Sequence, residues 1–145
     1  MEKIINFDMD GTLADFYNVE NWLNKILNED ASPYGEAKPK VNTNLIDSLL
    51  ETLQEQGYEI NIISWGCKGG SKEFLKTVEK VKKEWLNTYF KTKFDNIFIV
   101  DYGTPKESIK KGILFDDEYK NRCAWNGVAF NEECIECVLF DLVMR

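Results

Sequence analysis

The stretch Lys-Ile-Ile-Asn-Phe-Asp-Met-Asp-Gly-Thr-Leu-Ala-Asp, residues 3–15, decides the fold. It begins with an apolar run typical of a strand buried on both faces, and the run ends at two carboxylates, Asp8 and Asp10. Side chains two positions apart in an extended segment point the same way, so the two carboxylates start as neighbours, and Gly11 lets the backbone turn away. Neighbouring carboxylates repel each other unless a cation or a shared proton intervenes, and Mg²⁺ is the usual cation. Taken alone, Asp-x-Asp-Gly fits a plain acidic turn equally well.

The composition fits one domain with a hydrophobic core and narrows the chemistry. The chain has 145 residues, of which 43% are hydrophobic, and it contains no histidine. Ser-His and Cys-His catalytic arrangements are therefore excluded, and acid–base work must come from carboxylates or lysines. The four cysteines lack the partners of a complete zinc site, so we expect free thiols in a reducing compartment.

Charge and hydropathy bear on partners and location. The net charge of −7 disfavours an extended nucleic-acid-binding surface, which requires clustered lysine and arginine. No segment approaches the roughly 18 apolar residues of a membrane span. Because the N-terminus leads directly into the first expected strand, it leaves no room for a signal peptide. We expect a cytoplasmic protein.

Predicted strands and helices alternate along the chain, which indicates right-handed crossovers and a doubly wound parallel sheet. Ligands bind such sheets at the carboxyl ends of the strands, and Asp8, Ser64 and Asp117 all fall at expected strand ends. We therefore expect one site built from distant segments. The expected strands are 4–7, 59–63, 96–100, 113–115 and 128–130; the expected helices are 19–28, 43–56, 71–89, one beginning near 104–106, 119–125 and 132–143, and 29–40 is expected to be a loop.

Four segments, in this order, resemble the four motifs of the haloacid dehalogenase (HAD) superfamily of phosphotransfer enzymes. The resemblance covers essentially the whole chain and implies a three-layer Rossmann-like domain over 1–145, with a small helical cap insertion at about 17–43. The matching positions are Asp8 (nucleophile), Asp10 (general acid and base), Ser64 (strand-end hydroxyl), Lys106 (lysine of the third motif), and Asp116 and Asp117 (acidic fourth motif).

The resemblance implies a magnesium-dependent phosphatase in which Asp8 forms an aspartyl phosphate and Asp10 moves the proton. The Asp8 carboxylate, the Asp10 carbonyl and Asp117, favoured over Asp116, would hold Mg²⁺. Transferred phosphoryl oxygens would be stabilised by Ser64, Lys106 and N–H groups of the turn at Trp65.

Each later motif also has a plain structural interpretation. Ser64 could be an ordinary turn serine, and Lys106 a solvated lysine. Asp116 and Asp117 could be a pair of acids at a helix N-terminus. The rivals for the role of Lys106 are Lys68, Lys110 and Lys111.

The finer pattern around Asp8, Lys106 and Asp116 is similar to the 5′(3′)-deoxyribonucleotidase family, which implies a nucleoside monophosphate as the small phosphorylated substrate. A phenylalanine at the position of Phe16 helps to hold the base in that family. The longer helical cap of that family is largely missing here. The alternatives are a phosphatase of nucleic-acid ends or of another macromolecule, and a non-catalytic phospholigand-binding module.

The apolar stripe of the last expected helix, within 132–143, leaves two alternatives open. It could pack internally, which we favour, or form the face of a homodimer.

Overall fold

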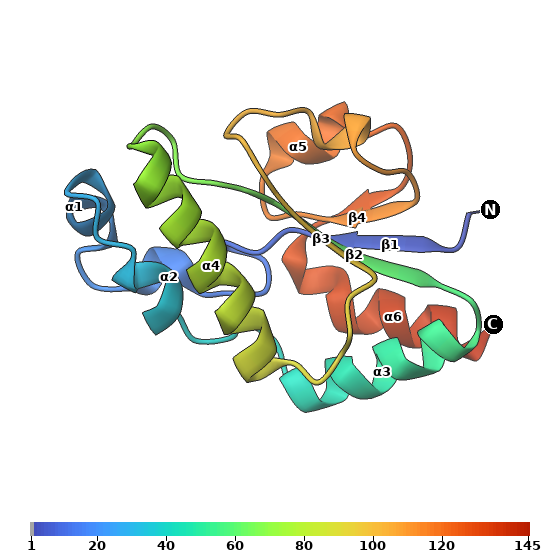
Figure 1. Ribbon diagram of the computed structural model, residues 1–145. Coiled ribbons are helices and arrows are strands. Elements are labelled where there is room, and N and C mark those ends of the chain that lie inside the picture. The colour runs from blue at the N-terminus through green and yellow to red at the C-terminus, as the bar shows by residue number, and fades with distance from the viewer. Residues whose placement is uncertain (1) are drawn as a thin grey trace.

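The computed structural model describes residues 2–145 and has a sheet of five parallel strands at its centre (Figure 1). The strand order is β3-β2-β1-β4-β5, so the chain winds outward from the central strand in one direction and later in the other. This reversal creates a switch point between β1 and β4, where a sheet of this type places its ligand site. The strands are β1 (Ile4–Phe7), β2 (Glu59–Trp65), β3 (Asn96–Val100), β4 (Ile113–Phe115) and β5 (Ala129–Phe130).

Helices flank the sheet, with α3 and α6 below it and α5 above it in Figure 1. The predicted α/β class with an all-parallel, Rossmann-like sheet is therefore confirmed. Within residues 2–145, no helix combines the length and apolar character needed to cross a membrane. The helices are α1 (Trp22–Leu27), α2 (Ser32–Glu36), α3 (Thr43–Glu55), α4 (Lys72–Tyr89), α5 (Tyr119–Ala124) and α6 (Ile135–Met144), and single 3-10 turns cover η1 (Phe16–Asn18), η2 (Lys106–Ser108) and η3 (Glu132–Cys134).

The two faces of the sheet are unlike. Alternation along β1 sends Ile5 and Phe7 into the main core, where they pack with residues of α3 and α6. Asn6, on the opposite face, belongs to a row of three asparagines in register on neighbouring strands. Asn61 Nδ2 donates to Asn6 Oδ1 at 3.0 Å, and Asn96 Nδ2 donates to Asn61 Oδ1 at 2.9 Å. The row satisfies polar groups that burial would otherwise penalise.

Three local predictions are wrong. The first helix begins at Trp22 and not near residue 19, because Asn21 takes a left-handed backbone conformation with φ of 59°. The expected loop over 29–40 contains the short helix α2, whose first turn accommodates Pro33. The helix expected near residue 104 is only the 3-10 turn that begins at Lys106.

The predicted starts of α3 and α4 are confirmed to within one residue, and the structure shows the side chains that cap them. The side chain of Asn42 accepts from the backbone N–H of Leu45 at the start of α3, and Ser71 caps α4 in the same way. In the last helix, Ile135, Leu139 and Leu142 are buried in the main core, whereas Phe140 is exposed, so the apolar stripe packs internally in part.

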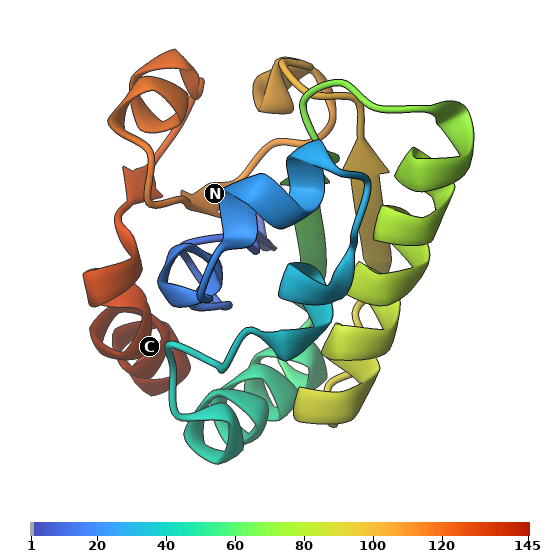
Figure 2. The ribbon, with the colours of Figure 1, turned by 90° about the vertical axis from the view of Figure 1, so that its left-hand side faces the viewer.

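The segment 16–42 lies beyond the carboxyl ends of the strands, with α1 and α2 beside the N-terminal half of α4 (Figures 1 and 2). Phe16 and Tyr34 pack there against Phe74 and Val78 of α4, forming a second apolar cluster separate from the main core. This segment occupies the place where the sequence predicts a small cap.

Gly112 provides a test of the packing around β1. Both Gly112 and Gly103 have positive φ, +96° and +86°, but a Cβ on Gly112 would overlap the carbonyl oxygen of Ile4, whereas a Cβ on Gly103 meets nothing within 4 Å. We expect Gly103→Ala to cost about 1–2 kcal/mol of unfolding free energy and Gly112→Ala about 1–3 kcal/mol more. Equal losses in urea denaturation of the two variants would contradict the close approach at Ile4.

Candidate active site

A pocket of about 520 Å³ opens at the carboxyl edge of the sheet, where the loops after β1, β2 and β4 meet. All but one of the residues predicted for the site line this pocket. Asp117, the exception, lies beside it, in contact with Thr12. The predicted residues in the lining are Asp8, Asp10, Phe16, Ser64, Trp65, Lys106 and Asp116.

Asp8 lies at the end of β1 and is only 6% exposed. Its Oδ1 accepts from Lys106 Nζ at 2.9 Å and its Oδ2 from the Thr12 hydroxyl at 2.9 Å. Burial alone would raise the pKa of Asp8, but the Lys106 ammonium and the hydrogen bonds around the carboxylate hold that pKa below its ordinary value. The group is therefore a fixed, ionised carboxylate facing a pocket.

Lys106 joins two motifs that lie far apart in the sequence. Its buried ammonium donates to Asp8 and also to Asp116 Oδ2, at 2.7 Å. Burial opposes the charge, but the two carboxylates raise the pKa of Lys106 above its ordinary value. Of its sequence rivals, Lys68 lines the pocket, but the structure places Lys106, and not Lys68, against Asp8.

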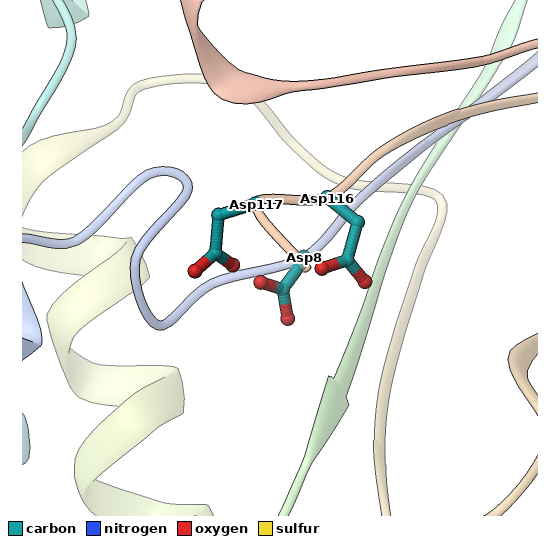
Figure 3. A group of neighbouring side chains, drawn as sticks. All are labelled: Asp8, Asp116 and Asp117. Carbon is teal, nitrogen blue, oxygen red and sulfur yellow. The ribbon is translucent and has the colours of Figure 1, made fainter. Parts of the chain in front are cut away.

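The carboxylates of Asp8, Asp116 and Asp117 form a cluster in which one oxygen from each lies within 4.8 Å of the others (Figure 3). Burial first, and then the nearby Asp8, raises the pKa of Asp116 to about 6 and that of Asp117 to about 8. Negative charge is thus crowded at this point, and a divalent cation with oxygen ligands would relieve the crowding. The cluster could hold such a cation.

Asp116 and Asp117 differ in how many hydrogen bonds their carboxylates accept from the rest of the protein. The fully buried Asp116 accepts from Lys106, from the N–H of Glu118 and from Asn121. Asp117 is half-buried, and its Oδ1 lies 3.2 Å from the Thr12 hydroxyl. Asp117 is therefore the better placed of the two to bind a cation, as the sequence pattern favours.

Gly11 allows this arrangement. It has a φ of +83°, and a Cβ at this position would overlap the carboxylate of Asp117. Only glycine therefore permits the loop after β1 to turn so close to the loop after β4.

Asp10 has a partner that the sequence interpretation missed. Its Oδ2 accepts from Lys82 Nζ at 2.8 Å, and Lys82 reaches it from the middle of α4. Burial raises the pKa of Asp10 in spite of this ion pair. A signal was present in the sequence, since Lys82 interrupts the apolar stripe of α4 at the spacing of Val78, Trp85 and Leu86.

Aromatic side chains line the outer part of the pocket. Phe16, predicted to contact substrate, is buried and stacks on Tyr34 with ring centroids 4.6 Å apart. On the other side, Trp65 lies 4.9 Å from Tyr102 between ring centroids, and Trp65 Nε1 donates to the carbonyl of Thr104 at 2.8 Å. The pocket thus has a charged floor and aromatic walls.

No model of a known protein family matches the chain, and a search of curated proteins finds no match either. The chemistry of the site therefore has to be argued from its residues.

The unequal roles of Asp116 and Asp117 can be tested by stability. In Asp116→Asn an amide N–H₂ must face the N–H of Glu118 or the ammonium of Lys106, so we expect a loss of about 1–3 kcal/mol of unfolding free energy. Asp117→Asn replaces a carboxyl group whose charged form is disfavoured by burial and by Asp8, and we expect a free energy within about 0.5 kcal/mol of the parent value or above it. Urea denaturation with a chelator present measures both. A larger loss in Asp117→Asn would show that the assignment is reversed.

Proposed function

We propose that the protein is a magnesium-dependent phosphomonoesterase of the HAD type that works through an aspartyl phosphate on Asp8. The observation that carries the proposal is the ionised Asp8 carboxylate, held by Lys106 and Thr12 in the pocket, with Asp10 two residues away in the same lining. A nucleophile needs an ordered, ionised oxygen, and an adjacent acid must be able to protonate the leaving group.

The reaction takes place in two displacements. An oxygen of Asp8 bonds to phosphorus while the ester P–O bond breaks, and Asp10 gives its proton to the departing oxygen. Water then attacks the phosphorus of the aspartyl phosphate, Asp10 accepts a proton from that water, and inorganic phosphate leaves with Asp8 restored. The raised pKa of Asp10 suits it to hold the proton that the first step requires.

Positive charge and N–H groups balance the charge of the phosphoryl group. Lys106 lies 2.9 Å from Asp8, and Ser64 and Trp65 line the same pocket, so phosphoryl oxygens seated beside Asp8 would meet these groups. They are the groups that the HAD resemblance assigns to phosphate binding.

The donor set fits Mg²⁺. Carboxylate oxygens are the ligands that this ion prefers, and Asp8 and Asp117, with Asp116 behind them, gather more negative charge than Lys106 offsets. When bound, Mg²⁺ would neutralise part of the charge that keeps a phosphate ester away from Asp8.

Nucleoside monophosphates are the substrates that we favour. A phosphoryl group needs only the floor of the pocket, whereas the volume of about 520 Å³ and the aromatic walls leave room for an attached ring system. Flat rings stack favourably on aromatic side chains.

Phosphate release tests the chemistry. We expect the protein with Mg²⁺ to release phosphate from deoxyribonucleoside and ribonucleoside 3′- or 5′-monophosphates faster than from phosphosugars. Asp8→Asn should lose activity by at least about 1,000-fold, because no nucleophile remains. The matched control is Asp141→Asn, an exposed aspartate of α6, which should keep the parental rate. Release that persists in Asp8→Asn would refute the mechanism, and no release from any ester would favour a binding role.

The metal requirement provides a separate test. We expect a chelator to abolish phosphate release and added Mg²⁺ to restore it. Asp117→Asn should need at least about tenfold more Mg²⁺ for half-maximal activity, because the ion loses a charged ligand. Full activity in the chelator would contradict the proposed role of the cation.

A further inference from the structure

Lys82 is a buried lysine that neither the sequence motifs nor the mechanism above employ. Its side chain is 1% exposed, and its ammonium has three oxygen partners. The ammonium donates to Asp10 Oδ2 at 2.8 Å, to Ser64 Oγ at 2.9 Å and to the carbonyl of Trp65 at 2.7 Å. An ammonium has three protons, so its hydrogen-bonding capacity is filled.

Lys82 lies behind the pocket wall and not on it. Asp10, Ser64 and Trp65 all line the pocket, whereas Lys82 is not part of the lining. A substrate would therefore touch the partners of Lys82 and not Lys82 itself. Any effect of this lysine on a reaction must pass through the groups that it holds.

The hydrogen bonds of Lys82 restrict the orientation of the Ser64 hydroxyl and of the Asp10 carboxyl group. Because Lys82 donates to Ser64 Oγ, the hydroxyl proton of Ser64 remains available for another acceptor, and its contact with the Trp65 carbonyl is long, at 3.4 Å. Because Lys82 binds Oδ2 of Asp10, it fixes the rotation of that carboxyl group. The ring of Tyr34 lies 5.0 Å from the ammonium and closes the site of Lys82 from the side of segment 16–42.

We infer that Lys82 is a positioning residue that orients Asp10 for proton transfer to the leaving group and turns the Ser64 hydroxyl toward the phosphoryl site. The inference rests on the proposed phosphatase function. It assigns to α4 a part in the reaction that the four sequence motifs do not include.

The dependence of rate on the leaving group tests the inference. Phenyl phosphate has a poor leaving group that needs a proton, whereas 2,4-dinitrophenyl phosphate has a good one that departs without it. We expect Lys82→Met to lower kcat/KM for phenyl phosphate about 100-fold and that for the dinitrophenyl ester much less, because general acid catalysis is lost only where it is needed. The ratio of the two values does not depend on how much of the sample is folded.

The matched control is Lys83→Met, which removes a half-exposed lysine of α4 whose partner is the surface residue Glu79. It should leave both kcat/KM values and their ratio unchanged. Equal losses for the two esters in Lys82→Met would overturn its action on the leaving group through Asp10, and no loss for either ester would overturn the positioning role altogether.

A second comparison covers the case in which Lys82→Met fails to fold because Asp10 has lost its partner. The double variant Asp10→Asn, Lys82→Met carries no unpaired charge at this contact, and in Asp10→Asn the Lys82 ammonium keeps its neutral acceptors on Ser64 and Trp65. If Lys82 acts on the leaving group through Asp10, the ratio of the two esters is the same in both, and a further selective fall for phenyl phosphate in the double variant refutes the inference. If the parent protein hydrolyses neither the two esters nor a nucleoside monophosphate, the proposed function itself fails and the inference with it.

Discussion

The ion pairs of Lys106 with Asp8 and Asp116 are the interaction on which the site depends. A buried ammonium is tolerated only when it is closely paired, and here both partners sit at the ends of neighbouring parallel strands, β1 and β4. The same contacts keep Asp8 ionised and position the loop that carries Asp117. Fold and site are therefore coupled, since the switch point of the sheet creates the meeting place and the ion pairs stabilise it.

Around this centre the charges are arranged in two groups, one of three residues and one of two. Lys106 forms ion pairs with Asp8 and Asp116, and Lys82 forms an ion pair with Asp10. Asp117 has the Thr12 hydroxyl as a neighbour, and burial first, and then the nearby Asp8, raises its pKa to about 8. Under the proposed function, a cation binds at Asp117, and the Asp10 carboxyl group transfers the proton.

The strand ends at Asp8 and Asp116 could be predicted from the sequence, because an apolar run that stops at a carboxylate carries its own signal. The strand predicted over 59–63 continues through Ser64 and Trp65, which pair with β3. The starts of α3 and α4 were predicted to within one residue, because Asn42 and Ser71 are residue types that cap helices. Lys82 was not identified, because its pairing joins residues 72 positions apart and depends on how α4 packs. The short α1 and α2 were misjudged because tertiary contacts near Tyr34, and not local propensity, decide that segment. The Asn6 row also depends on the strand register, which only the structure supplies.

Under the proposed function, Asp8 becomes covalently phosphorylated. The most direct measurement is to mix the protein with Mg²⁺ and a nucleoside monophosphate, quench the reaction in acid within the first turnover, and locate the phosphoryl group by peptide mass spectrometry. We expect a phosphoryl group on Asp8 that hydroxylamine removes, as is typical of an acyl phosphate. Phosphate release with Asp8 unmodified throughout, or a phosphoryl group on another residue, would refute this mechanism.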